Sequence, residues 1–157
     1  MANRGTVEAL FLAPDSGDPM EAVDSVEAVA GRGLRGDRYF RERGLYDRRE
    51  NLPEGTDVTL IEREAIDAAE RKLGTSFPAS KTRRNIVTSD TPLNDLVDAE
   101  FQVGGATVVG VRLCTPCSYM EGLADVDGAE DALEGRGGLN ANVVDSGTIS
   151  VADPVMF

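Results

Sequence analysis

The two cysteines of the chain, Cys114 and Cys117, are separated by only two residues and follow an apolar stretch, Val108 to Leu113. A thiolate is a soft metal ligand and a nucleophile that accepts sulfur, so this pair is the first candidate for chemistry. A structural zinc site would need two further ligands, and the chain has no other cysteine and no histidine. Three hypotheses remain, which are a single working thiol, a dithiol redox pair, and two buried, inert cysteines.

A pair of arginines, Arg83 and Arg84, opens a predicted strand at Asn85 to Thr88. A guanidinium group binds carboxylates and phosphates through paired N–H donors, so an arginine at a strand end is suited to holding an anionic ligand. The alternative is an ordinary solvated basic pair. Because histidine is absent, proton transfer and metal binding must use carboxylates, thiols or tyrosines.

A glycine-rich string, Gly31-x-Gly33-x-x-Gly36, matches the dinucleotide-binding fingerprint in its letters. That fingerprint requires a helix opening at its last glycine, so that free N–H groups face the pyrophosphate. Here Asp37 and a charged segment, Arg41 to Gly55, follow instead. A glycine-rich turn that brings the backbone close to some other ligand is the favoured interpretation, and the charged segment is expected to be a functional loop.

The composition predicts one acidic domain spanning residues 1–157, large enough to bury a core without disulfides. Its formal charge of -12 disfavours a nucleic-acid partner, which requires a basic surface. Only two of the 16 basic residues are lysines, Lys72 and Lys81, and scarce lysine with dispersed acidity is typical of halophilic proteins. No apolar run suits a membrane span or a signal peptide, so a cytoplasmic location is expected.

Short strands dominate the predicted elements, and regular alternation of strands and helices is missing. One full helix is predicted at Glu62 to Leu73, where apolar residues recur at helical spacing and Gly74 follows. Glu100 to Gly110 predicts a hairpin around Gly104 and Gly105. Further strands are predicted at Thr6 to Leu12, Ser25 to Val29, Asp57 to Ile61, Asn85 to Thr88, Leu139 to Val144 and Thr148 to Val151. The fold class is therefore expected to be mostly β (α+β), with a closed or barrel-like sheet and one or two flanking helices.

Several segments, taken in order, resemble the MOSC domain, the module found at the C-terminus of molybdenum-cofactor sulfurases and as stand-alone prokaryotic proteins. The resemblance covers nearly the whole chain. The segments that carry it are Gly33 to Phe40, Val58 to Glu62, Arg84 to Val87, Phe101 to Gly104, Pro116-Cys117, Gly137 to Val144 and Gly147 to Pro154.

The resemblance implies a mostly β fold and a cysteine that carries sulfur or ligates molybdenum in a pterin cofactor. Cys117 is the matching cysteine, expected to be both the catalytic residue and the metal ligand. The residues implied to contact the cofactor are Gly36, Asp37, Arg38, Arg84, Asn85 and Asn140. The family often has a histidine at the position of Arg38 and arginine in the segment that contains Asn140.

The leading functional hypothesis is a protein that binds the molybdenum cofactor (molybdopterin) or carries sulfur as a persulfide. Reduction of N-hydroxylated substrates is an associated activity, and a cysteine desulfurase or an electron-transfer protein would be the partner. The alternative is a metal-free dithiol oxidoreductase that uses Cys114 and Cys117. Cys114 is expected to be partly packed at the strand end, and Cys117 to hold the reactive thiolate.

Overall fold

The structure, a computed structural model, describes residues 3–14, 19–40, 57–114 and 128–157. The strands are β1 (Arg4–Leu12), β2 (Glu21–Val23), β3 (Ser25–Val29), β4 (Gly33–Leu34), β5 (Val58–Glu62), β6 (Ile86–Ser89), β7 (Glu100–Val103), β8 (Ala106–Leu113), β9 (Leu139–Asp145), β10 (Gly147–Ser150) and β11 (Pro154–Met156). The helices are α1 (Arg63–Leu73) and the short α3 (Ala129–Ala132), accompanied by two 3-10 turns, η1 (Ala79–Thr82) and η2 (Leu93–Leu96).

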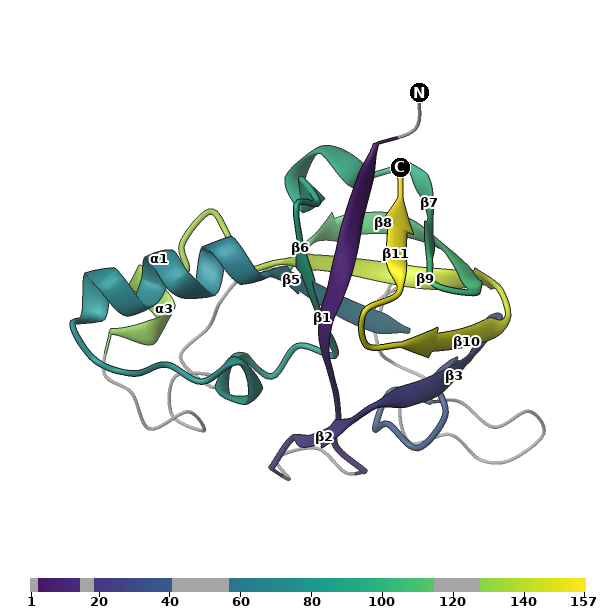
Figure 1. The fold of residues 1–157 in the computed structure, drawn as a ribbon, viewed down its shortest axis with the longest axis horizontal. Coiled ribbons are helices and arrows are strands. Elements are labelled where there is room, and N and C mark those ends of the chain that lie inside the picture. Colours follow the sequence, from purple (N-terminus) through teal and green to yellow (C-terminus); the bar gives the residue numbers. More distant parts are fainter. Residues whose placement is uncertain (1–2, 15–18, 41–56, 115–127) are drawn as a thin grey trace.

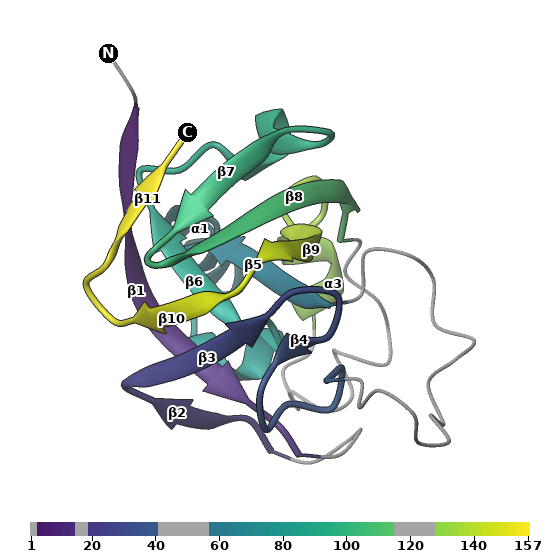
Figure 2. The same ribbon diagram turned by 90° about the vertical axis from the view of Figure 1, so that its right-hand side faces the viewer.

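Seven strands form a closed barrel. Neighbours pair in the order β11, β7, β8, β9, β5, β6 and β1, and β1 pairs with β11 to complete the circle. Figure 2 shows β1, β11, β7 and β8 following one another around it. Side chains alternate between the two faces of each strand, so one set fills the interior. A row across four adjacent strands illustrates this packing, and its buried members are Leu10, Ile86, Leu60 and Leu139.

One helix crosses the outside of the barrel between two parallel strands. β5 and β6 pair in parallel and are connected through α1. The apolar face of α1 packs against the outer surface of these strands and against α3, and Figure 1 shows both helices on the same side of the barrel. α1 ends at Gly74, whose φ of 68° is a conformation that glycine adopts without strain.

The expected strand-dominated, barrel-like fold with flanking helices is confirmed. The predicted helix and the predicted hairpin of β7 and β8 are both present, with bounds that differ from expectation by a few residues. The sequence pattern does not predict β2, β4 or β11. No helix in the described ranges is both long and apolar enough to cross a membrane.

The glycine-rich string forms a turn without a following helix. Gly33 opens β4 with φ of 110°, and a Cβ at this position would lie 2.6 Å from the carbonyl oxygen of Asp57. The close approach that glycine permits here is therefore to the protein's own backbone. Residues 35–39 continue in turns, so the helix that a dinucleotide site needs is missing from this described segment.

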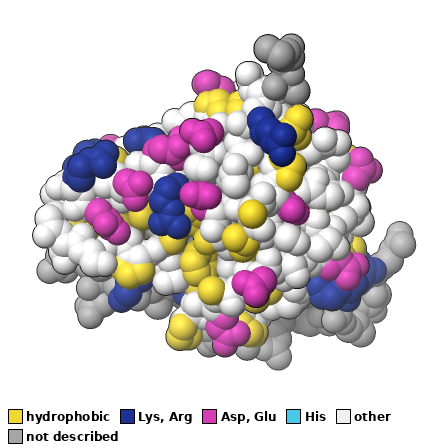
Figure 3. Space-filling view, in the orientation of Figure 1, with side chains coloured by type: hydrophobic (Ala, Val, Ile, Leu, Met, Phe, Trp, Pro, Cys, Tyr) yellow, Lys and Arg dark blue, Asp and Glu magenta, His cyan; other side chains and the backbone are white. Residues whose placement is uncertain are grey.

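Charged side chains are mixed over the surface. Figure 3 shows acidic groups scattered across one face and interspersed with arginine and lysine. On this face the negative charge is spread out, and no single acidic patch dominates it.

Candidate functional site

Arg84 lies in a turn that buries its side chain. The turn η1 ends at Arg83, whose left-handed conformation (φ 63°) reverses the chain before β6 begins at Ile86. Only 7% of Arg84 is exposed. Its Nε donates to the carbonyl oxygen of Gly137 at 2.8 Å, and its Nη1 donates to the carbonyl oxygen of Thr82 at 3.3 Å.

The third nitrogen of the Arg84 guanidinium, Nη2, is buried and has no hydrogen-bond partner among the described residues. Both side-chain bonds of Arg84 are to neutral carbonyl groups, and no ion pair of Arg84 occurs in the same part of the chain. Burial removes water from this cation without supplying an opposite charge, which is unfavourable. An anionic group that accepts from Nη2 would offset that cost, so Arg84 is suited to binding an anion.

Two glycines, Gly137 and Gly138, connect Arg84 to the end of β8. The carbonyl of Gly137 accepts from Arg84, and the carbonyl of Gly138 accepts from the N–H of Cys114 at 2.8 Å. Gly138 has φ of 110°, and a Cβ at this position would overlap the carbonyl oxygen of Leu60, so only glycine fits. This segment brings together the arginine and the cysteine strand, which are far apart in sequence.

The first cysteine is half-buried directly after β8, as expected for a packed strand end. Its partner in the motif, Cys117, lies outside the described residues, and so does the charged segment Arg41 to Gly55. Within the described ranges, no cluster of three histidine, cysteine or carboxylate side chains forms a metal site.

A cavity of about 230 Å³ lies next to Cys114. Three carboxylates from α3 and the residues after it face this cavity, and they make it unsuited to an anion. The cavity is lined by Asn94, Leu113, Cys114, Glu130, Asp131, Glu134, Gly135, Gly137 and Gly138.

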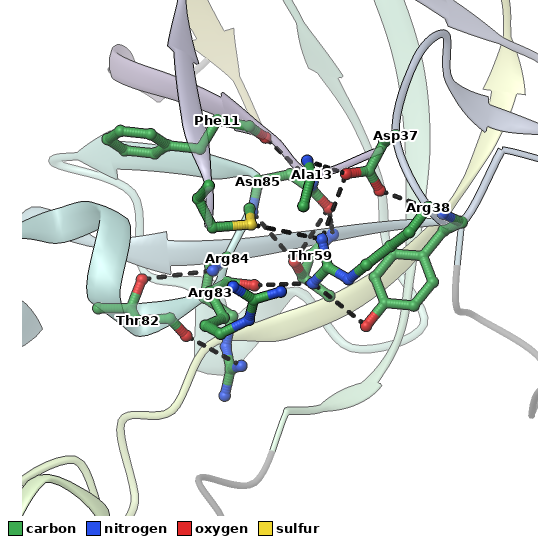
Figure 4. A network of polar contacts seen from close by, with 11 residues as sticks. Phe11, Ala13, Asp37, Arg38, Thr59, Thr82, Arg83, Arg84 and Asn85 are labelled. Carbon is green, nitrogen blue, oxygen red and sulfur yellow. Dashed lines mark hydrogen bonds and ion pairs between the residues drawn. The ribbon is translucent and has the colours of Figure 1, made fainter. Parts of the chain in front are cut away.

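The expected ligands Asp37 and Arg38 form a buried cluster beside Arg83 (Figure 4). The Oδ1 atom of Asp37 accepts from the N–H of Ala13 at 3.0 Å and from Nη1 of Arg38 at 3.2 Å. Nη2 of Arg38 in turn donates to the carbonyl oxygen of Arg83 at 3.1 Å. Gly36, with φ of 93°, allows the turn that leads into the cluster.

Asn85 is fully buried, and its side chain is bonded to the neighbouring strands. Its Oδ1 accepts from both the N–H and the hydroxyl of Thr59, each at 3.1 Å, and its Nδ2 donates to the carbonyl of Phe11 at 3.1 Å. These bonds join the residue before β6 to β5 and β1. Asn85 therefore holds in place the chain segment that directly follows Arg84. Thr59 is a site-supporting residue that sequence reasoning misses, because a threonine in a strand is unremarkable by itself.

Asn140 lies on the outer face of β9. Its register partners are Thr59 on β5 and Arg112 on β8, and paired side chains share a face of the sheet. Because the flanking residues Leu139 and Ala141 are buried in the barrel, Asn140 points outward and is half-exposed. Asn140 is one of the residues expected to contact the cofactor. It is partly exposed and lies close to the Gly137-Gly138 segment in the chain.

Glu62, directly before α1, is a second residue that sequence reasoning misses. One of its oxygens lies 3.5 Å from Nη2 of Arg136, the residue before Gly137. Burial raises the pKa of Glu62 above its ordinary value of 4.5, while the charge of Arg136 lowers it and that of Glu64 raises it. The ion pair of Glu62 and Arg136 therefore links the start of α1 to the Gly137-Gly138 segment that Arg84 contacts.

Comparison with known proteins identifies the family. A sequence profile described as "MOSC domain" matches residues 47–156, which is more than half of the chain. Comparison with curated proteins gives no match.

Solved structures share the fold at low sequence identity. The crystal structure of YuaD from Bacillus subtilis aligns over 99% of this chain and 97% of its own, with a TM-score of 0.75 and 19% identity. YiiM from Geobacillus stearothermophilus aligns over 98% of this chain and 75% of its own, with a TM-score of 0.73 and 16% identity. YiiM from Escherichia coli aligns over 99% and 69%, with a TM-score of 0.68 and 16% identity. With the profile match and the barrel agreeing, the chain belongs to the MOSC domain family.

Proposed function

We propose that this protein binds the molybdenum cofactor, a phosphorylated pterin, and uses the thiolate of Cys117 to ligate molybdenum or to carry sulfur. Membership of the MOSC family supports a molybdopterin-type ligand. The observation that carries the proposal is the buried guanidinium of Arg84, which finds within the described residues neither a partner for its Nη2 donor nor a carboxylate for its charge. A phosphate or another oxyanion of the ligand would supply both a hydrogen-bond acceptor for Nη2 and an opposite charge for the guanidinium.

Three parts of the described structure fit such a ligand. Arg84 would hold its anionic group, and half-exposed Asn140 would offer an amide on the adjoining outer face. The Gly137-Gly138 segment, whose carbonyl oxygens accept from Arg84 and from the N–H of Cys114, would lie between the two ends of the ligand. When bound, the cofactor would supply redox chemistry at molybdenum, such as reduction of an N-hydroxylated substrate with electrons from a separate partner protein.

The two cysteines have different roles in this proposal. Cys114 is half-buried directly after β8 and its backbone N–H donates to the carbonyl oxygen of Gly138, so it is held as part of the strand end. Cys117 is therefore the proposed working thiolate. In the sulfur-carrying version, a cysteine desulfurase would deliver the sulfur atom to Cys117.

A pair of matched variants tests this assignment. The protein is isolated from a host that makes the cofactor, treated with a persulfide-trapping reagent and analysed by peptide mass spectrometry and by elemental analysis for molybdenum. Cys117→Ser is expected to lose the persulfide or the molybdenum, and Cys114→Ser to retain most of it. Equal loss from both variants, with a reversible disulfide between the two cysteines and no molybdenum, would establish the dithiol oxidoreductase instead.

A further inference from the structure

We infer that Arg38 is a positioning residue for the anion-binding group Arg84, and not itself a ligand. This inference rests on the anion site proposed above. It separates two arginines that are both buried in the same region, with 7% of each residue exposed. The difference between them lies in how many guanidinium donors the fold already uses.

Four of the five guanidinium N–H donors of Arg38 are committed to the protein. Each Nη nitrogen of a guanidinium carries two hydrogens. Nη1 contacts Asp37 Oδ1 at 3.2 Å and Met20 Sδ at 3.4 Å, while Nη2 contacts the Arg83 carbonyl at 3.1 Å and the Tyr39 hydroxyl at 3.4 Å. The guanidinium also stacks on the Tyr39 ring, 4.3 Å from its centroid. These four contacts account for all four Nη hydrogens, whereas Nη2 of Arg84 has no hydrogen-bond partner among the described residues.

The bond from Arg38 to the Arg83 carbonyl acts directly on the backbone of Arg84. That carbonyl belongs to the peptide group that joins Arg83 to Arg84, and a peptide group is planar. Fixing the oxygen therefore fixes the orientation of the backbone nitrogen of Arg84, two residues before β6 begins. Arg83 also adopts φ of 63°, a conformation that non-glycine residues hold only where their surroundings enforce it.

Arg38 is itself held from the opposite side of the cluster. Its ion-pair partner Asp37 has a fully buried side chain, and 8% of the Arg38 side chain is exposed. The carboxylate of Asp37 also accepts from the N–H groups of Ala13 and Tyr39, so it cannot follow a shift of Arg38. The network thus extends from the loop after β1, through Asp37 and Arg38, to the peptide group before Arg84, as Figure 4 shows.

The test uses the full chain purified without cofactor, with inorganic phosphate as the probe. NMR of the arginine side chains follows the Nε–H signals of Arg84 and Arg38 during a phosphate titration of the wild-type protein. Phosphate is expected to move the Arg84 signal and to leave the Arg38 signal nearly unchanged. A shift of the Arg38 signal as large as that of Arg84 would overturn the inference and make Arg38 a ligand. This measurement needs no variant and so does not depend on a substituted protein folding.

Variants then test the positioning role. Arg38→Lys keeps the charge but cannot contact both the Asp37 carboxylate and the Arg83 carbonyl as a fork does. It is expected to shift the Arg84 Nε–H signal before phosphate is added, because the bond to Gly137 is disturbed, and to weaken phosphate binding at least fivefold. Arg35→Lys, a change at an exposed arginine of the same turn, should leave the Arg84 Nε–H signal and the affinity for phosphate unchanged.

The two proposals fail in different ways. If phosphate binds equally well to wild-type protein and to Arg84→Met, the anion site is wrong. If Arg84→Met loses binding while folded Arg38→Lys keeps the wild-type affinity and the wild-type Arg84 signal, the positioning role is wrong. The Arg84 signal of the ligand-free protein decides the positioning role by itself, whether or not phosphate binds.

Discussion

Substituting Gly138 by alanine should strongly destabilise the protein and disrupt the segment that joins Arg84 to Cys114. An alanine at φ of 110° costs about 1–2 kcal/mol from backbone strain. Its Cβ would also overlap the carbonyl oxygen of Leu60, a backbone atom that cannot rotate away. Moving the segment to relieve that overlap breaks the bond from the Cys114 N–H, and an unsatisfied buried donor costs about 1–3 kcal/mol. The expected total of these two costs is about 2–5 kcal/mol.

Gly135→Ala is the matched control for this prediction. Gly135 also has a positive φ, 79°, but a Cβ there would meet nothing within 4 Å. Its loss should be limited to the strain of about 1–2 kcal/mol. The assay is urea denaturation of both variants and the wild type, followed by circular dichroism. Losses that agree within about 0.5 kcal/mol would refute the claim that close packing against Leu60 fixes the segment.

Three further substitutions or conditions test other parts of the structure. Asn85→Ala should lower the free energy of unfolding by about 2–4 kcal/mol, because it leaves buried groups of Thr59 and Phe11 without their hydrogen-bond partner. Urea titrations that give a loss below about 1 kcal/mol would contradict the role of Asn85 in joining the strands. Glu62→Gln should gain stability relative to wild type as the pH rises from about 4.5 towards neutrality. The reason is that the pKa of Glu62 is raised in the folded state, so ionisation of its carboxyl group opposes folding. Urea titrations at several pH values that show the opposite trend would contradict this prediction. The thermal midpoint should rise between low and molar potassium chloride, because salt screens the repulsion of a net charge of -12, and a flat or falling midpoint would argue against halophilic behaviour.

Local patterns were sufficient for the elements whose causes are local. Helical spacing and Gly74 identify α1, and alternation around Gly104 identifies the hairpin of β7 and β8. β11 (Pro154–Met156) escapes such reasoning because it has only three residues and begins with proline. It is a strand because it pairs with β1 on one side and β7 on the other, and these distant pairings close the barrel.

The candidate site was predictable in its residue types and less so in its roles. The position of Arg83 and Arg84 before a strand left two hypotheses open, an anion-binding role for one of them and an ordinary basic pair. The structure adds that Arg84 has a buried donor without a partner among the described residues. The sequence does not distinguish Arg84 from Arg38, because the distinction depends on which carbonyl groups face each side chain after folding. For the same reason the sequence does not show that the side chain of Asn85, expected as a ligand contact, is buried and bonded to Thr59.

The most direct test of the proposed function is the amount of molybdopterin and molybdenum that copurifies with the protein from a cofactor-producing host. Wild-type protein is compared with Arg84→Met and with Arg71→Met, which removes the same charge from an exposed position on α1. Circular dichroism confirms that all three are folded. The proposal predicts pterin and molybdenum in wild type and in Arg71→Met, and a loss of at least tenfold in Arg84→Met, since a lost charge-assisted contact is worth about 1.5–3 kcal/mol. Equal cofactor content in Arg84→Met and wild type, or none in any of the three, would contradict it.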